Sequence, residues 1–153
     1  MSWARLMRYI GHWQALGYGY WARCLKNRVG VSWGRLVFQE VKRNLTPALE
    51  HPEAGWSLIP AVHGQGYAAE ALSAVLNWAD NNFSGPVCCI IDDDNQRSIG
   101  LAERFGFTFQ HYVEYHGSKY ECSFARTIAN HAWPCSEVAV LLGRPPESID
   151  KLF

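Results

Sequence analysis

The stretch EAGWSLIPAVHGQGYAAEALSAVLNWADNNF, residues 53–83, decides the expected fold. Residues 53–59 are expected to form a strand that ends at Pro60, because proline lacks the N–H group that a ladder needs. A turn with two glycines follows, and from Gly66 onward apolar residues recur at helical spacing. A strand, a glycine turn and a helix N-terminus together present backbone N–H groups and the positive end of a helix dipole. The stretch therefore predicts a site for an anionic group.

The segments around this stretch predict a sheet with flanking helices. Residues 87–91, Val-Cys-Cys-Ile-Ile, form the continuous apolar run typical of a strand buried on both faces. The other expected elements are a core-facing amphipathic helix over 3–16, strands over 18–25 and 29–38, a surface loop over 39–52, a helix over 95–105, and a hairpin of strands 107–115 and 119–125. This order predicts an α/β (α+β) fold with a mixed, mostly antiparallel central sheet, flanking helices and one strand-helix-strand crossover.

Length and composition indicate one compact domain followed by a tail. The chain has 153 residues, of which 48% are hydrophobic, enough for a sizeable core. Residues 127–153 differ in character, because prolines separate their short apolar pieces. We expect a weak helix over 136–142 and a tail that otherwise packs loosely or not at all.

Charge and cysteine usage limit the classes of function. Fourteen basic and fourteen acidic side chains cancel, which disfavours binding to nucleic acid or to an anionic membrane. The five cysteines are scattered without the paired spacing of a zinc site, and no metal is expected. Arg5, Arg8 and His12 interrupt the apolar residues at the N-terminus, so no export or spanning segment is visible. A reduced, cytoplasmic protein fits best.

Three further groups of residues are assigned to packing or capping. Consecutive carboxylates before a helix are more often capping partners than metal ligands. Cysteines in a buried strand are expected to behave as small hydrophobes. Aromatic residues at alternate strand positions are mostly cross-strand pairs, although they could shape an acceptor pocket. The residues concerned are Asp92, Asp93 and Asp94, then Cys88 and Cys89, then Tyr112, Tyr115, His116 and Tyr120.

The run HGQGYAAEA, residues 63–71, resembles the acetyl-CoA pyrophosphate loop of the GCN5-related N-acetyltransferases (GNAT). That pattern is Gln or Arg, two residues, Gly, one residue, then Gly or Ala; Gly66 and Ala68 match it, whereas His63 stands at the Gln or Arg position. The flanking blocks EAGWSLIP and DNQRSIGLAERFGF match too. Three blocks in order extend the resemblance over residues 1–126, as a GNAT-like acetyltransferase domain. The similarity is to the branch that includes ribosomal-protein N-terminal acetyltransferases.

The resemblance implies how acetyl-CoA is bound. Backbone N–H groups of residues 64–68 would hold the pyrophosphate, and pantetheine would lie along residues 57–59, where that strand splays from residues 87–91. Asn95 and Ser98 match family residues that contact the pantetheine and thiol region; the alternatives are a helix cap and a packed small residue. The implied cofactor-binding residues are Ser57, Leu58, Ile59, His63, Gly64, Gln65, Gly66, Tyr67, Ala68, Asn95 and Ser98.

The resemblance also implies direct transfer of the acetyl group to an amine. Glu53 is the candidate base, acting through water; the alternative is a solvated glutamate beside Pro52. A main-chain N–H within residues 56–59 would stabilise the oxyanion. Ala102 stands where many members carry a tyrosine acid, so the thiolate would leave through the catalytic candidate Ser98 and water, or another group would serve.

Family members usually begin with a strand and a helix before the helix expected at 3–16, and both are missing here. Their absence is expected to expose a sheet edge and to open the acceptor pocket. The leading hypothesis is an acetyl-CoA-dependent N-acetyltransferase that acts on a primary amine of a small molecule or of a peptide N-terminus. The alternative is a catalytically impaired acyl-CoA-binding or protein-interaction module. A third option is a purely structural partner protein that uses its exposed sheet edge, for example as a homodimer.

Overall fold

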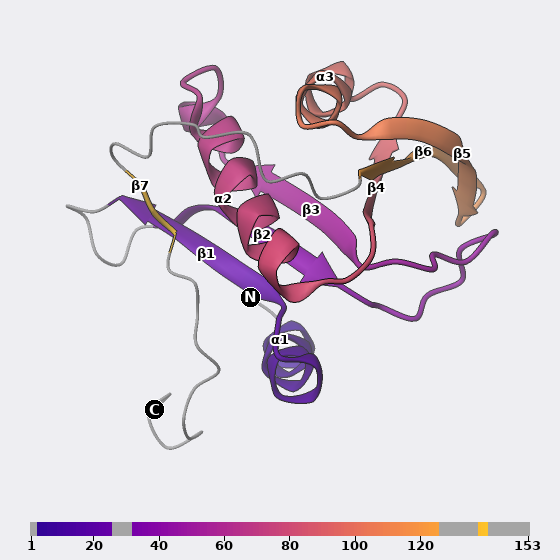
Figure 1. Cartoon of the computed structure of the whole chain (residues 1–153), viewed down its shortest axis with the longest axis horizontal. Coiled ribbons are helices and arrows are strands. Elements are labelled where there is room, and N and C mark those ends of the chain that lie inside the picture. Colours follow the sequence, from indigo (N-terminus) through magenta and orange to yellow (C-terminus); the bar gives the residue numbers. More distant parts are fainter. Residues whose placement is uncertain (1–2, 26–31, 126–137, 141–153) are drawn as a thin grey trace.

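The computed structural model describes residues 3–25, 32–125 and 138–140 (Figure 1). The elements are α1 (Trp3–Leu16), β1 (Tyr20–Leu25), β2 (Ser32–Gln39), β3 (Glu53–Leu58), the 3₁₀ helix η1 (Pro60–Val62), α2 (Tyr67–Asn82), β4 (Val87–Asp92), α3 (Gln96–Arg104), β5 (Thr108–Tyr115), β6 (Ser118–Ala125) and β7 (Val138–Val140). Each element expected between residues 3 and 125 is present, with small shifts at its ends.

One sheet contains all the described strands, in the order β5-β6-β4-β3-β2-β1-β7. Five of its neighbouring pairs are antiparallel, and only β3 and β4 run parallel, joined by α2. A parallel pair needs such a crossover, because a short turn cannot return the chain to the same end of the sheet. The expected mixed, mostly antiparallel sheet with one crossover is confirmed.

The parallel pair β3–β4 is joined at a single register position, Glu53 opposite Cys88. Beside it, the N–H of Cys88 donates to the carbonyl oxygen of Pro52 at 3.0 Å. Beyond this point β3 stays paired with β2 as far as Leu58, and β4 stays paired with β6 as far as Asp92. The two strands therefore diverge towards their carboxyl ends, as Figure 1 shows. This is the splay that the family resemblance implies.

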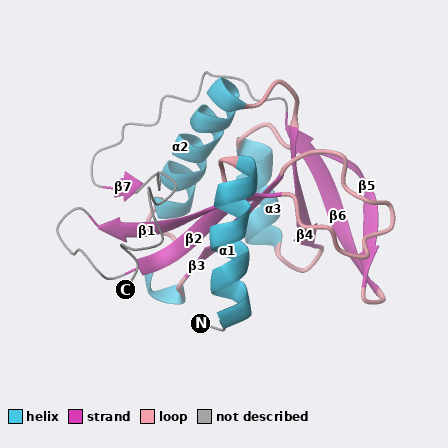
Figure 2. Cartoon of the chain, turned by 90° about the horizontal axis from the view of Figure 1, so that it is seen from below, coloured by secondary structure: helices cyan, strands magenta, loops and turns pink. Residues whose placement is uncertain are grey.

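The alternation of side chains along the strands gives the sheet two differently covered faces. Leu36, Phe38 and Ala54 belong to a core cluster with residues of α2 and α3, and we call this side the helical face. The other side is covered by α1 and by residues 40–52, and we call it the loop face. There Leu45 packs with Cys88 of β4 and with residues of β5 and β6, and α1 runs across β2 and β3 (Figure 2).

An aromatic cluster fills the core of the helical face. Trp21 and Phe38 are almost fully buried, and their rings meet edge to face with a centroid distance of 5.8 Å. Trp78 of α2 lies 5.3 Å from Trp21, and Phe83 lies 5.2 Å from Phe38. Edge-to-face pairs of this kind add to the free energy gained from burial alone. The cluster fixes α2 against β1 and β2.

The expectation that α1 faces the core is wrong for most of the helix. No residue of α1 is buried, and Trp3 and Met7 are 65% and 38% exposed. Some residues of the helix do contact the sheet. Tyr9 stacks on Tyr20 with a centroid distance of 3.7 Å, and Trp13 packs edge to face on Trp21. Apolar periodicity shows which residues share a face, but not that another element covers it. No helix among the described residues is long and apolar enough to cross a lipid bilayer.

The tail contributes to the sheet, contrary to the expectation of a loosely packed appendage with a weak helix. Residues 138–140 form β7, antiparallel to β1, with Val138 opposite Leu25 and Val140 opposite Arg23. The valines favour a strand, and the edge of β1 offers the pairing groups. The edge expected to be exposed is therefore partly covered. The rest of the helix expected over 136–142 lies outside the described residues, and the domain boundary at 126 stays a prediction.

We expect Phe38→Ala to lower the free energy of unfolding by about 3–5 kcal/mol, because it removes a fully buried ring from the aromatic cluster. Urea denaturation followed by tryptophan fluorescence measures this loss. Phe109→Ala is the matched control, since that ring is 51% exposed and its removal should cost under about 1 kcal/mol. Equal losses in the two variants would contradict the assigned core.

Candidate functional site

The turn before α2 takes a backbone conformation that requires its glycines. Gly64 and Gly66 have φ angles of +74° and +82°, in the left-handed region that other residues rarely adopt. A Cβ atom at either position would meet no protein atom within 4 Å, so the space above the turn is open. Residues 63–66 are exposed to solvent. The turn therefore presents its backbone to a ligand without a side chain in the way.

The start of α2 supplies donors at the same place. Gly66 is the N-cap, and its carbonyl oxygen accepts the first intrahelical bond, from the N–H of Glu70 at 3.1 Å. The amides of Ala68 and Ala69, in the first turn, have no intrahelical acceptor. They lie at the positive end of the dipole of a 16-residue helix. This arrangement suits a phosphate group.

The side chains of the turn bend back onto the backbone before it. The Nε2 atom of His63 lies 3.0 Å from the carbonyl oxygen of Leu58, so the tautomer with a proton on Nε2 donates to it. Gln65 donates from Nε2 to the carbonyl oxygen of Ala61, also at 3.0 Å. Both residues, predicted to bind the cofactor, thus also hold the turn against the end of β3.

The edge of β3 that faces β4 is open beyond the single register pair. The N–H of Ile59 donates to the carbonyl oxygen of Trp33, on the β2 side of β3. Because successive N–H groups of a strand point to opposite sides, those of Trp56 and Leu58 point towards β4. No strand partner meets these two amides among the described residues. An extended ligand with amide groups can add to such an edge as another strand would.

The helix α3 closes the other side of the divergence. Asn95 is its N-cap, and its side-chain oxygen accepts from the N–H of Ser98 at 3.2 Å, which confirms the capping alternative for this residue. The Ser98 hydroxyl oxygen accepts from Nε1 of Trp56 at 3.3 Å. This bond links α3 to β3 across the place where β3 and β4 have separated. Asn95 and Ser98 therefore lie beside the open edge of β3.

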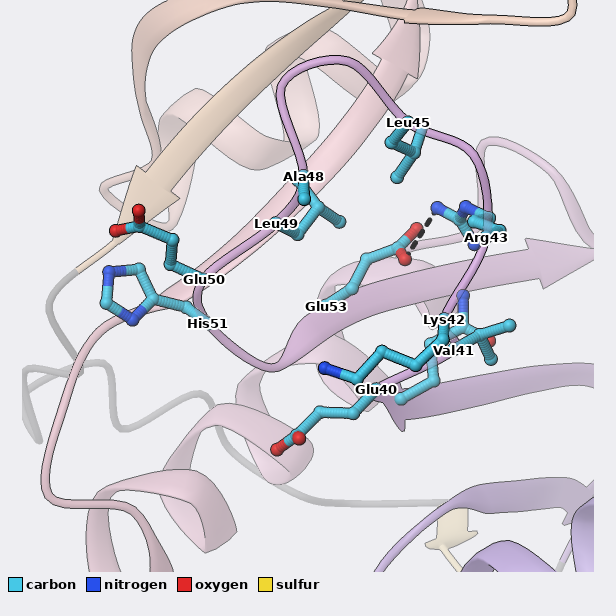
Figure 3. Close-up of a pocket in the computed structure, with 11 residues that line it drawn as sticks. Glu40, Val41, Lys42, Arg43, Leu45, Ala48, Leu49, Glu50, His51 and Glu53 are labelled. Atoms are coloured by element: carbon cyan, nitrogen blue, oxygen red, sulfur yellow. Dashed lines mark hydrogen bonds and ion pairs between the residues drawn. The ribbon is translucent and has the colours of Figure 1, made fainter.

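Glu53 is buried and ion-paired, so the alternative of a solvated glutamate is wrong. Its side chain is 9% exposed, and Oε2 accepts from Nη2 of Arg43 at 2.6 Å (Figure 3). The pair lies in a cavity of about 100 Å³ between β3 and residues 40–51 on the loop face. No partner of Oε1 is recorded in the described part of the chain. Arg43 thus engages one of the two carboxylate oxygens of Glu53.

A larger cavity, of about 810 Å³, lies beside this one on the loop face. It is lined by residues of α1 and of β1 to β3, including Gly55 and Ser57, and by Tyr115 of β5. Arg43 lines both cavities, with its guanidinium 5.6 Å from the ring centroid of Tyr115. The expected cofactor strand, residues 57–59, therefore borders a cavity large enough for a second substrate.

Several other predicted assignments can be judged from burial. Cys88 and Cys89 are fully buried, and burial raises the pKa of the Cys89 thiol well above its usual range, which confirms them as unreactive packing residues. Ala102 is 2% exposed within α3 and offers no acid. Asp92 accepts from the N–H of Asp94 at 3.0 Å, as a turn residue does. Within the described ranges, no three His, Cys, Asp or Glu residues are grouped to hold a metal ion.

Arg43 and the side-chain contact of Trp56 are the parts of the site that the sequence did not reveal. Arg43 lies in an aperiodic loop, and its place depends on the bridge that Thr46 forms with Glu114 of β5. Trp56 is recognisable as a strand residue, but its bond to Ser98 joins positions 42 residues apart. Neither contact has a local sequence signal.

Solved structures of acetyltransferases share this fold. A protein of Bordetella pertussis assigned to the GNAT acetyltransferases is 32% identical, with a TM-score of 0.73 over 81% of this chain and 75% of that one. The ribosomal-protein-S5-alanine acetyltransferase of Vibrio fischeri has a TM-score of 0.65 at 12% identity, over 81% and 69%. The phosphinothricin acetyltransferase of Sinorhizobium meliloti, solved with acetyl-CoA, has a TM-score of 0.60 at 23% identity, over 81% and 68%.

The family model for the acetyltransferase (GNAT) domain matches residues 1–108, from α1 to the start of β5. This match contains the glycine turn, the open edge of β3, Glu53 and all of α3. Together with the B. pertussis relative, it shows that the chain belongs to the GNAT acetyltransferase family, whose co-substrate is acetyl-CoA.

Proposed function

We propose that the protein is an N-acetyltransferase that transfers the acetyl group of acetyl-CoA directly to a primary amine of a small molecule or of a peptide N-terminus. The observation that carries the proposal is the divergence of β3 from β4 after Glu53, with the glycine turn of α2 at its open end. The glycine turn suits a pyrophosphate, and the open edge of β3 suits an extended chain that contains amide groups.

The residues present fit acetyl-CoA. The amides of the turn and of the first turn of α2 would hold the pyrophosphate, because the space above Gly64 and Gly66 is open. The open edge at Trp56 and Leu58 would bind the pantetheine amides. Ser57 and Ile59 alternate with these residues, and Asn95 and Ser98 face the edge from α3. The predicted cofactor residues would thus bind successive parts of the same extended cofactor.

The chain also offers groups for each proton in the reaction. Water held at Oε1 of Glu53 would take the proton of the attacking amine as the new C–N bond forms. Whichever N–H group of Trp56 and Leu58 is not used by the pantetheine would stabilise the oxyanion. As the C–S bond breaks, the thiolate would take a proton from the Ser98 hydroxyl or from water. Ser98 suits this role because its oxygen already accepts from Trp56, which leaves its own proton to donate.

Two observations favour the second candidate, a catalytically impaired acyl-CoA-binding or protein-interaction module. Ala102 leaves the position of the usual acid without a functional group, and Glu53 is engaged with Arg43. Such a module would bind acetyl-CoA as tightly as an enzyme does, but it would acetylate no amine. Turnover, and not cofactor affinity, therefore separates the two functions.

Gly66→Ala is expected to raise the Kd for acetyl-CoA about tenfold or more, because a side chain at positive φ distorts the turn and fills the open space above it. Isothermal titration calorimetry measures this change. Gly117→Ala is the matched control, since Gly117 has a φ of +80° in the β5–β6 turn and equally open surroundings. It should lose similar stability and keep its affinity. Equal affinity in both variants would refute the assigned pyrophosphate site.

Glu53→Gln is expected to lower kcat about 10²- to 10⁴-fold at an unchanged Kd for acetyl-CoA, because it removes the base and keeps the shape of the side chain. Arg43→Gln separates this role from the ion pair: it breaks the pair but retains the carboxylate, so kcat should fall far less. Steady-state rates with an amine panel and calorimetry provide both values. Equal losses of kcat would assign Glu53 a structural role, and no turnover in the wild type would support the binding module.

A further inference from the structure

The large cavity on the loop face is strongly basic. Its described lining contains five cationic side chains and neither an aspartate nor a glutamate: Arg5, Arg8, Arg35, Lys42 and Arg43. The whole chain has fourteen basic and fourteen acidic residues, so this is a local concentration of charge in a protein without net charge. A cavity lined by one sign of charge focuses the potential and attracts ions of the opposite sign.

Most of these cations have no recorded counter-ion among the residues that the structure describes. Arg43 is neutralised by Glu53, although its Nε atom is buried with no hydrogen-bond partner among the described residues. Arg35 donates from Nη1 to the Tyr9 hydroxyl at 3.3 Å, and that is a neutral partner. Across the described ranges, no ion pair is recorded for Arg5, Arg8 or Arg35. Arg5, Arg8 and Arg35 are exposed to solvent, so their charges are accessible to an anionic ligand that enters the cavity.

The cations reach the cavity from two sides. Arg5 and Arg8 are three residues apart in α1 and so share a helix face, whereas Arg35 lies in β2. Arg35 pairs in register with Ser57 of β3, which also lines the cavity. The cationic groups therefore lie next to the strand that would carry the pantetheine.

We infer that the acetyl acceptor is an amine that also bears an anionic group, a carboxylate or a phosphate, and that Arg8 and Arg35 bind this group in the cavity. This inference rests on the proposed N-acetyltransferase function and names its class of acceptor. The guanidinium groups match carboxylate and phosphate oxygens in geometry as well as charge. Polyamines, whose several positive charges would be repelled, are poor acceptors by the same reasoning.

The same charges would assist the reaction. A nearby cation disfavours a second positive charge and so lowers the pKa of a bound ammonium group. The acceptor amine is therefore more often neutral in this cavity than in water, and only the neutral amine can attack the thioester. The cations would thus orient the acceptor through its anion and make its amine nucleophilic, while Glu53 and its water take the remaining proton.

The phosphates of acetyl-CoA are the other anions that these side chains could bind. None of residues 63–68, the expected pyrophosphate site, lines the basic cavity. The cavity borders β3 at Gly55, Trp56 and Ser57, before the turn begins. It therefore lies at the thioester end of the open edge, which favours the acceptor as the source of the anion.

Matched acceptors test the inference. The panel pairs free amino acids with their carboxamides, phosphoethanolamine with ethanolamine, and includes spermidine. For at least one type of pair, we expect the wild-type kcat/KM to be about tenfold or more higher for the anionic amine than for its neutral partner. Whether this is the carboxylate or the phosphate pair shows which anion the site binds. Arg35→Gln and Arg8→Gln should each reduce this ratio of kcat/KM values to about one at an unchanged Kd for acetyl-CoA. Lys119→Gln, outside the cavity, is the matched control and should change neither value.

Calorimetric titration of the same pairs into the CoA-saturated protein separates this inference from the proposed function. Binding of an anionic amine that depends on Arg35, but without acetyl transfer, would contradict the transferase function and support the anion site. Equal use or equal binding of anionic and neutral partners, or preference for spermidine, would overturn the anion site. It would also be overturned if Arg8→Gln and Arg35→Gln weakened acetyl-CoA binding and left acceptor selectivity unchanged.

Discussion

The site depends on one constraint in the sheet: β3 and β4 pair at Glu53 and Cys88 and then separate. Each strand is held on its far side, β3 by β2 and β4 by β6, so neither can move across to close the gap. Buried backbone groups normally need partners. The amides of Trp56 and Leu58 lie on the open edge, and a ligand with amides of its own satisfies them. The bond from Trp56 to Ser98 stabilises this open arrangement.

Features from both faces of the sheet meet at this divergence of β3 and β4. The crossover through α2 brings a helix N-terminus to the open end, while the aromatic cluster around Phe38 holds that helix in place. On the loop face, Glu53 and the basic cavity lie beside the same strand. In the proposed reaction the cofactor and the acceptor would therefore approach each other from the two sides of β3. In the proposed arrangement backbone groups bind the cofactor and side chains bind the acceptor, so the choice of acceptor depends more on sequence.

The sequence was sufficient to predict those elements of the fold that a local pattern determines. The helical spacing of Ala71, Leu72, Val75 and Ala79 predicted α2, and the glycines before it predicted the turn. Long-range contacts had no such signal. The apolar period of α1 could not show that no element covers Trp3, and β7 depends on an edge of β1 more than a hundred residues away. Arg5, Arg8 and Arg35 are unremarkable in the sequence and form a cluster only when α1 crosses β2.

Amide hydrogen exchange, with and without acetyl-CoA, tests the central claim most directly. The claim is that the open edge of β3 and the start of α2 bind the cofactor. It predicts slower exchange at Trp56, Leu58 and Ala68 when acetyl-CoA is added, with little change at Ser57, which already faces β2. Unchanged exchange at Trp56 and Leu58 in the presence of saturating acetyl-CoA would contradict it.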